Sequence, residues 1–226
     1  MSTIAENIST LAERIIDAAK AVERDPASVG LLAVSKTKPA SDLREAYAAG
    51  LRDFGENYLQ EALGKQVQLN DLPLIWHFIG PIQSNKTRAI AENFAWVHSV
   101  DRLKIAQRLS EQRPEDLPPL NICIQVNVSG EGSKSGCTPQ DLPALANAIN
   151  ALPNLRLRGL MAIPEPTEDR DEQNAAFAAV RTLQDALNLS LDTLSMGMSH
   201  DLEAAVAQGA TWVRIGTALF GARNYG

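Results

Sequence analysis

Short apolar runs alternate with helical stretches along most of the chain, and this alternation constrains the fold more than any other feature. Eight runs have the length and apolar content of buried β-strands: residues 29–34, 53–56, 75–79, 96–100, 122–128, 157–163, 193–198 and 212–215. Strands separated by helices indicate a parallel α/β sheet. Eight strands in 226 residues favour a closed (β/α)8 TIM barrel, with residues 1–226 as a single domain.

A doubly wound open sheet is the alternative arrangement of the same elements. That fold usually has a glycine-rich turn after its first strand. Here the first run is followed by Ser35-Lys36-Thr37-Lys38-Pro39. The closed barrel is therefore the preferred interpretation.

An extra N-terminal helix is expected ahead of the first strand. Within residues 3–24 the apolar side chains recur at helical spacing, at Ile4, Ile8, Leu11, Ile15 and Val22. Polar residues fill the opposite face, so this helix should pack one side against the barrel.

Some helix boundaries are also marked in the sequence. Ser41 and Asp101 are expected to cap the helices that follow them, because their side chains can accept a hydrogen bond from an unpaired backbone N–H. Gly50 and Gly209 are expected to end helices, since glycine adopts the left-handed conformation without strain.

Composition argues against several classes of partner. The chain carries 27 acidic and 21 basic residues, for a formal charge of −6, and its lysines and arginines are scattered. Nucleic-acid binding is therefore not expected, because it requires clustered basic residues. No run approaches the ~20 apolar residues of a membrane span, and the first ten residues do not resemble a targeting signal.

The cysteines point to a reducing compartment. Cys123 and Cys137 form no C-x-x-C pair and are expected to be free thiols. Together with the absence of a visible targeting signal, they predict a soluble, cytoplasmic protein, which we expect to be a monomer.

Lys36 is the first candidate for chemistry, because it directly follows an apolar strand. Ligands of barrels of this type bind at the carboxyl ends of the strands. Partial burial there would lower the pKa of the amine and leave it free to attack an aldehyde. A solvated lysine at a strand end is the plainer alternative.

The last strand offers a possible anion site. Strand alternation places Arg214 opposite Val213 and Ile215, so Arg214 points into the barrel if the two apolar residues face the helices. Gly216 and Thr217 follow, where a small residue and a hydroxyl could approach a phosphate. An internal salt bridge and an ordinary turn are the alternative.

Ser199 ends the seventh run and could contact an anion or simply cap a helix. A hydrolase elbow, G-x-S-x-G, is excluded because Asp201 occupies the last glycine position. Neighbouring Ser199, His200 and Asp201 cannot form a catalytic triad either, because triad side chains must converge in space.

Asn57 and His77 follow or lie in two further strands and could hydrogen-bond a ligand, or be ordinary satisfied polar groups. The three histidines, His77, His98 and His200, lack metal-ligand spacing, so no metal is expected. Lys134, on the glycine-rich loop 130–136, could capture or release a ligand transiently, although a simple surface lysine is the plainer interpretation.

Six ordered segments resemble one known family, the pyridoxal phosphate homeostasis proteins, which are related to the barrel domain of alanine racemase. They are LLAVSKTKP, FGENYLQE, WHFIGPIQSNK, LRGLMAI, LSMGMSHDLEAA and VRIGTALFGAR, and they run from about Val29 to Tyr225.

The resemblance implies a cofactor site. It implies pyridoxal 5′-phosphate as a Schiff base on Lys36, with Arg214 facing the pyridine nitrogen. Phosphate contacts would fall on Ser199, Gly216 and Thr217, with Asn57 and His77 close to the ring.

The function that follows is a non-catalytic carrier or buffer of pyridoxal phosphate in vitamin B6 and amino-acid homeostasis. An arginine at the ring nitrogen makes the ring a weak electron sink. The racemases of this fold draw a second base, usually tyrosine, from a separate C-terminal β domain, for which this chain has no room. Pyridoxal-phosphate-dependent enzymes are possible partners that would receive the cofactor. The alternatives are an amino-acid racemase or related enzyme, and a cofactor-free Schiff-base aldolase.

Overall fold

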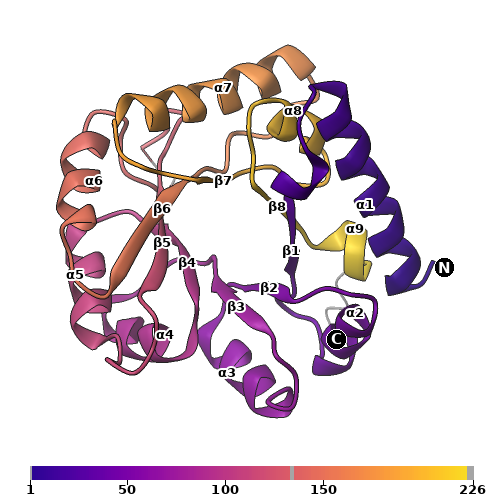
Figure 1. The fold of residues 1–226 in the computed structure, drawn as a ribbon, viewed down its shortest axis with the longest axis horizontal. Helices are drawn as coiled ribbons and strands as arrows, with labels where there is room; N and C mark the ends of the chain where they lie inside the picture. Colours follow the sequence, from indigo (N-terminus) through magenta and orange to yellow (C-terminus); the bar gives the residue numbers. More distant parts are fainter. Residues whose placement is uncertain (1, 133–134, 223–226) are drawn as a thin grey trace.

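The chain forms a closed barrel of parallel strands surrounded by helices (Figure 1). The computed structural model describes residues 2–132 and 135–222. Within these residues the strands pair in sequence order from β1 to β8, and β8 closes the barrel by pairing with β1. The prediction of a (β/α)8 barrel with an extra N-terminal helix is confirmed.

The strands are β1 (Gly30–Val34), β2 (Asp53–Glu56), β3 (Ile75–Phe78), β4 (Trp96–Val100), β5 (Leu120–Gln125), β6 (Leu155–Met161), β7 (Thr193–Ser195) and β8 (Trp212–Ile215). The helices are α1 (Ile4–Ala21), α2 (Ala40–Ala48), α3 (Leu59–Gln68), α4 (Thr87–Asn93), α5 (Leu103–Gln112), α6 (Leu142–Asn150), α7 (Arg170–Ala186), α8 (Leu202–Ala207) and α9 (Thr217–Phe220). Short 3-10 helices are η1 (Pro26–Ser28) and η2 (Ser84–Lys86).

Helix α1 begins with a reciprocal capping box. Thr3 Oγ1 accepts from the Glu6 backbone N–H at 3.1 Å, and a Glu6 carboxylate oxygen accepts from the Thr3 N–H at 2.8 Å. The buried face includes Leu11 and Ile15, and the helix lies beside α8 and α9 (Figure 1). Val22, expected on that face, instead ends the helix and is 39% exposed.

Three predicted strands run two or three residues past the observed ones. The runs 122–128, 157–163 and 193–198 stay apolar after β5, β6 and β7 end at residues 125, 161 and 195. Val126, Ala162 and Met196 are buried although they lie beyond the strands. Apolar composition follows burial, and here burial continues into the loops at the carboxyl end of the barrel.

Two predicted helix caps are wrong, and two predicted helix stops are confirmed. Pro39 occupies the N-cap of α2, so Ser41 lies inside its first turn. Arg102 precedes α5, while an Asp101 carboxylate oxygen accepts from the Gly136 N–H at 3.2 Å. Gly50 and Gly209 have φ of 107° and 102°, which is the left-handed region expected after a helix.

Two layers of packing hold the barrel. The main core lies between strands and helices and includes Phe54, Ile122 and Phe177. A second, smaller cluster of Trp96, Cys123 and Met161 forms separately from it. The strands also bury polar side chains, among them His77, His98, Ser195 and Arg214.

Among the described residues both cysteines are free thiols, as predicted. Burial raises the pKa of Cys123 to about 12 and that of Cys137 to about 11. No helix in residues 2–132 and 135–222 has the length and apolar character to cross a membrane. The same residues hold no group of three or more histidine, cysteine, aspartate or glutamate side chains able to bind a metal ion.

Candidate functional site

One cavity of about 220 Å³ collects most of the predicted site residues. It lies at the carboxyl ends of the strands, where barrel ligands bind. Six predicted residues line it: Lys36, Asn57, Ser199, Arg214, Gly216 and Thr217. These residues come from the ends of β1, β2, β7 and β8, so barrel closure brings together segments that are far apart in the sequence.

A larger hollow of about 600 Å³ lies at the opposite end of the barrel, beside Trp76, Phe94 and Pro118. None of the six residues lines it. The smaller cavity is the candidate site because the amine, the guanidinium and the small polar residues converge there. Lys134, the other predicted participant, lies outside the described residues.

The loop that carries Lys36 is braced on both sides of the lysine. Lys65, a buried residue of α3, donates from Nζ to the Ser35 carbonyl at 2.6 Å. On the other side, the Thr37 N–H donates to Glu61 Oε1 at 2.5 Å. Thr37 has a φ of 65°, a left-handed conformation that a non-glycine residue holds only where its surroundings enforce it.

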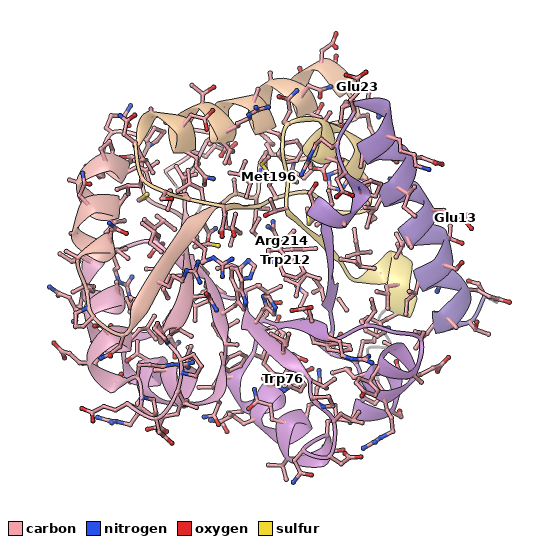
Figure 2. The ribbon with its side chains drawn as sticks, viewed as in Figure 1. Glu13, Glu23, Trp76, Met196, Trp212 and Arg214 are labelled. Carbon is pink, nitrogen blue, oxygen red and sulfur yellow. The ribbon has the colours of Figure 1, made fainter. Side chains whose placement is uncertain are left out.

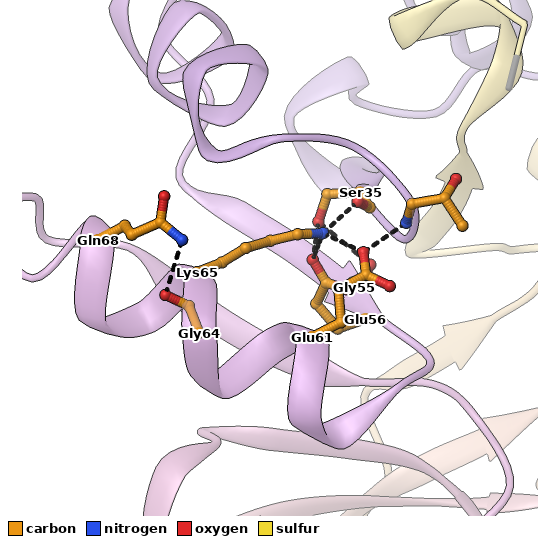
Figure 3. A network of polar contacts seen from close by, with 8 residues as sticks. Ser35, Gly55, Glu56, Glu61, Gly64, Lys65 and Gln68 are labelled. Atoms are coloured by element: carbon orange, nitrogen blue, oxygen red, sulfur yellow. Dashed lines mark hydrogen bonds and ion pairs between the residues drawn. The ribbon is translucent and has the colours of Figure 1, made fainter. Parts of the chain in front are cut away.

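Lys65 is the centre of the network that provides this bracing (Figure 3). Its Nζ also donates to Glu56 Oε1 at 2.7 Å and to Glu61 Oε1 at 2.6 Å. The Ser35 hydroxyl donates to Glu56 Oε1 at 2.8 Å. Burial raises the pKa of Glu56 above its ordinary value, and the nearby Lys65 ammonium opposes that rise.

Arg214 is the cation on the far side of the cavity. Its side chain lies inside the ring of strands next to Trp212 (Figure 2) and is 5% exposed. Nη1 donates to Ser195 Oγ at 2.8 Å and Nη2 donates to the Ala162 carbonyl at 3.0 Å. Burial lowers the Arg214 pKa to about 10, so the guanidinium is still charged at neutral pH.

The loop after β7 brings Ser199 to the cavity. Gly197 turns the chain with a φ of 101°, and the Met198 N–H donates to Asp201 Oδ1 at 2.6 Å. Arg14 of α1 donates from Nη2 to the Ser199 carbonyl at 2.8 Å. The extra helix therefore holds one wall of the cavity in place.

The structure does not bring His77 to the cavity. Its ring is fully buried inside the barrel, with Nδ1 2.9 Å from His98 Nε2 and Nε2 2.8 Å from Asp53 Oδ1. His98 in turn lies 2.7 Å from Ser195 Oγ, the acceptor of Arg214. Sequence analysis missed Asp53, His98 and Ser195 as parts of this arrangement.

A signal for the missed residues does exist in the sequence. His77, His98 and Ser195 each place a polar side chain within an otherwise apolar strand. A polar residue buried in a barrel requires a hydrogen-bond partner. Pairing these three with one another required the register between strands, which sequence alone does not provide.

The cavity has the chemistry of a site for a small anion with a reactive carbonyl. Lys36 and Arg214 supply positive charge, and the small or hydroxyl-bearing residues Ser199, Gly216 and Thr217 leave room for an oxyanion. Among the described residues, Asn57 Oδ1 is a buried oxygen without a hydrogen-bond partner. A bound molecule with a donor group would satisfy it.

Comparison with known proteins identifies the family to which the chain belongs. The family described as "Alanine racemase, N-terminal domain" matches residues 2–224, and the chain belongs to this family. The alanine racemase of Corynebacterium glutamicum shares the fold, with a TM-score of 0.70 at 20% identity over 97% of this chain and 61% of the racemase.

More similar relatives narrow the identification. The pyridoxal phosphate homeostasis protein of Pseudomonas aeruginosa is 78% identical over 226 residues, which is 100% of this chain and 98% of the relative. The structure of PipY from Synechococcus elongatus with pyridoxal phosphate bound has a TM-score of 0.85 at 44% identity, covering 97% of this chain and 100% of PipY. The resemblance to the pyridoxal phosphate homeostasis proteins is thereby confirmed.

Proposed function

We propose that this chain binds pyridoxal phosphate covalently at Lys36 and holds it without catalysing turnover, as a carrier or buffer in vitamin B6 and amino-acid homeostasis. The observation that carries the proposal is the convergence of Lys36, Arg214 and Ser199 on one cavity of about 220 Å³. The name of the 78% identical relative and the ligand of PipY support it.

Each residue of the cavity has a distinct part in the proposal. Lys36 would carry the cofactor, and Arg214 would face its ring nitrogen. Ser199, Gly216 and Thr217 would surround the phosphate, and Asn57 would meet a ring substituent. When bound, pyridoxal phosphate supplies an aldehyde that condenses with amines and a ring that withdraws electrons.

Two features favour storage over turnover. A guanidinium at the ring nitrogen disfavours protonation of the ring, which weakens its capacity to stabilise a carbanion. Among the described residues no tyrosine lines the cavity, so the described wall lacks the second base that racemases of this fold use. His200 at the rim is the one imidazole among the described lining residues.

Storage also requires that other nucleophiles of the protein do not react with the aldehyde of the cofactor. Burial keeps Cys123 and Cys137 protonated at neutral pH, because their pKa values are raised to about 12 and about 11. Free thiols of this kind also suit the cytoplasm, where we place the protein. There it would supply the cofactor to pyridoxal-phosphate-dependent apoenzymes.

Borohydride reduction followed by peptide mapping tests the attachment. Reduction of the protein loaded with pyridoxal phosphate should fix the cofactor on the peptide that contains Lys36. A Lys36→Ala variant should lose the reducible link, and Lys104→Ala, which removes an exposed lysine of α5, should keep it. Equal labelling of Lys36→Ala and the unchanged protein would refute the attachment.

Deuterium exchange tests the absence of turnover. The loaded protein is incubated in deuterated water with L-alanine, L-serine and other L-amino acids, and the α-position is followed by NMR. The proposal expects no catalytic exchange. Repeated turnover that requires Lys36 would replace the carrier with a racemase or related enzyme.

A further inference from the structure

A chain of hydrogen bonds crosses the barrel interior from Arg214 to Asp53. Starting at the cavity, the links are Arg214 Nη1 to Ser195 Oγ at 2.8 Å and Ser195 Oγ to His98 Nδ1 at 2.7 Å. His98 Nε2 then lies 2.9 Å from His77 Nδ1, and His77 Nε2 lies 2.8 Å from Asp53 Oδ1. Five strands (β8, β7, β4, β3 and β2) contribute to it, and of its members only Arg214 lines the cavity.

The first link is compatible with a single direction of donation along the whole chain. A guanidinium only donates, so the Ser195 oxygen accepts from Arg214 and its hydroxyl hydrogen is available for His98 Nδ1. A neutral imidazole that accepts at Nδ1 carries its hydrogen at Nε2. His98 therefore donates to His77 Nδ1, and His77 donates from Nε2 to the Asp53 carboxylate.

Donation in the opposite direction along the chain would require an unfavourable protonation state. If His98 donated to Ser195, it would have to accept from His77, and His77 would then face Asp53 without a hydrogen. That arrangement requires either a protonated Asp53 or a doubly protonated His77. Burial lowers the pKa values of both His77 and His98, so neutral rings are favoured.

The rings have little freedom to turn out of this arrangement. His77 stacks on Trp96 with ring centroids 5.4 Å apart and an interplanar angle of 12°. Trp212 meets His77 edge-on at 5.2 Å, and Trp96 lies 5.7 Å from His98. Both imidazoles are fully buried. The geometry is therefore fixed by packing as well as by hydrogen bonds.

We propose that Ser195, His98, His77 and Asp53 are positioning residues, which hold the guanidinium of Arg214 against the ring nitrogen of the bound cofactor. Together they form a one-way relay that begins at a cation and ends at a carboxylate. The side chain of Asp53 is 22% exposed, so the relay links Arg214 to solvent near the opposite end of the barrel. This inference depends on the proposed function, since it assigns a task to Arg214.

The relay adds to what keeps Arg214 charged in the barrel, where burial lowers the pKa of the guanidinium and the charge of Asp201 opposes that fall. Among the described residues no carboxylate lies within ion-pair distance of Arg214. Two of its five donors are used by Ser195 and the Ala162 carbonyl. Those two contacts fix the orientation of the planar guanidinium. The hydrogen bonds that run from Ser195 to Asp53 all point their dipoles the same way, with the negative end toward Arg214, and this stabilises its positive charge.

Nitrogen NMR of the protein without cofactor tests the direction of the relay. The expected result is that His77 and His98 are both neutral at pH about 7, each with its hydrogen on Nε2. A hydrogen on Nδ1 of either ring, or a doubly protonated His77, would overturn the relay. This measurement uses the unchanged protein, so it does not depend on any variant folding.

Paired ligands test whether the relay acts through Arg214. The probes are pyridoxal phosphate and its analogue with a C–H in place of the ring nitrogen. Ser195→Ala should weaken binding of pyridoxal phosphate by about tenfold or more, the scale expected for a hydrogen bond to a charged group. Binding of the analogue should change much less, and Ser195→Thr, which keeps a hydroxyl, should restore most of the loss.

Ser110→Ala is the matched control, because it removes another buried serine hydroxyl, the one that donates to the Pro153 carbonyl on the helix side. It should leave both affinities unchanged. Equal losses for both probes in Ser195→Ala would mean a merely structural role and would overturn the proposal. If Ser195→Ala does not fold, the His98 nitrogen signals of the unchanged protein decide instead: they should move more with pyridoxal phosphate than with the analogue, and equal shifts overturn the proposal.

The two proposals fail in different ways. If the relay is wrong but the proposed function is right, borohydride still labels Lys36 in the unchanged protein. If the proposed attachment is wrong, that label is absent, and if the absence of turnover is wrong, deuterium exchange shows it, whatever the histidine hydrogens are found to be.

Discussion

Replacing Lys65 by methionine should destabilise the protein in a strongly pH-dependent way. The Lys65 side chain is 6% exposed, and it pairs with Glu56, whose side chain is fully buried. Methionine fills similar volume without a charge. The variant therefore leaves the Glu56 carboxylate buried without its cation, and it also removes the donor to the Ser35 carbonyl beside Lys36.

The expected loss follows from the burial of the pair. Removing one partner of a buried ion pair costs roughly 3–5 kcal/mol, because the remaining charge is uncompensated. Glu61, the second acid on Lys65, is 30% exposed, and such a pair is worth about 1 kcal/mol or less. We expect Lys65→Met to lower the free energy of unfolding by about 3 kcal/mol at neutral pH, which a fold of ordinary stability survives.

The pH dependence has a defined sign. Burial already raises the pKa of Glu56 in the folded protein. A carboxyl group of this kind contributes its full stability below its ordinary pKa of about 4.3, and that contribution is lost as the pH rises through the raised folded value. Without the ammonium the folded pKa rises further. The deficit of the variant should therefore be small in mild acid and grow toward neutral pH.

Urea denaturation followed by circular dichroism, at about pH 5 and about pH 7.5, measures this difference. The control is the double variant Glu56→Gln with Lys65→Met, which replaces the stranded carboxylate by a neutral amide. It should recover most of the loss at the higher pH. A deficit for Lys65→Met that is equal at both pH values, or a double variant no more stable than the single one, would refute the reasoning.

Three further predictions concern other parts of the fold. Gly159→Ala would place a Cβ 1.7 Å from the Thr193 backbone oxygen and should lower the free energy of unfolding, measured with urea, by about 3 kcal/mol. A Cβ at Gly64 in α3 meets nothing within 4 Å, so Gly64→Ala should raise the free energy of unfolding by up to about 1 kcal/mol. Similar values for the two variants would contradict the packing. Cys123 should react with an aromatic disulfide reagent only as urea unfolds the chain, because burial raises its pKa to about 12, and fast reaction of the native protein would contradict this. Arg14 donates to the Ser199 carbonyl, so Arg14→Ala should disturb the proposed phosphate contact at Ser199. In equilibrium titrations the variant should bind pyridoxal phosphate a few-fold more weakly and pyridoxal with unchanged affinity. Equal losses for both ligands would contradict a phosphate role for the Ser199 loop.

Much of the architecture could be predicted because barrel strands have a local signature. Buried parallel strands are short apolar runs, and the runs 53–56, 96–100 and 212–215 coincide with β2, β4 and β8. The errors fall where burial and strand pairing diverge. Val126 and Met196 are buried loop residues, and an apolar run alone cannot distinguish them from strand.

The site was partly predictable for a related reason. Residues at the carboxyl ends of parallel strands converge, so Lys36, Asn57 and Ser199 could be grouped before any coordinates. The family resemblance predicts His77 close to the ligand ring, but His77 lies deeper in the barrel, where it meets Asp53 and His98 of the neighbouring strands. Such pairings depend on the stagger between strands, which composition and spacing do not encode.

The contacts of α1 with α8 and α9 also set the order in which the protein can assemble during synthesis. Asn7 donates to the Leu219 carbonyl, and Gly30 of β1 aligns with Trp212 of β8. Residues 4–30 are therefore synthesised well before their partners in residues 202–220, and their apolar surface stays uncovered until then. Long waits of this kind slow folding and expose nascent chains to aggregation. Chaperone dependence should accordingly be greatest for residues 4–34, whose partners are the last to follow them in the barrel.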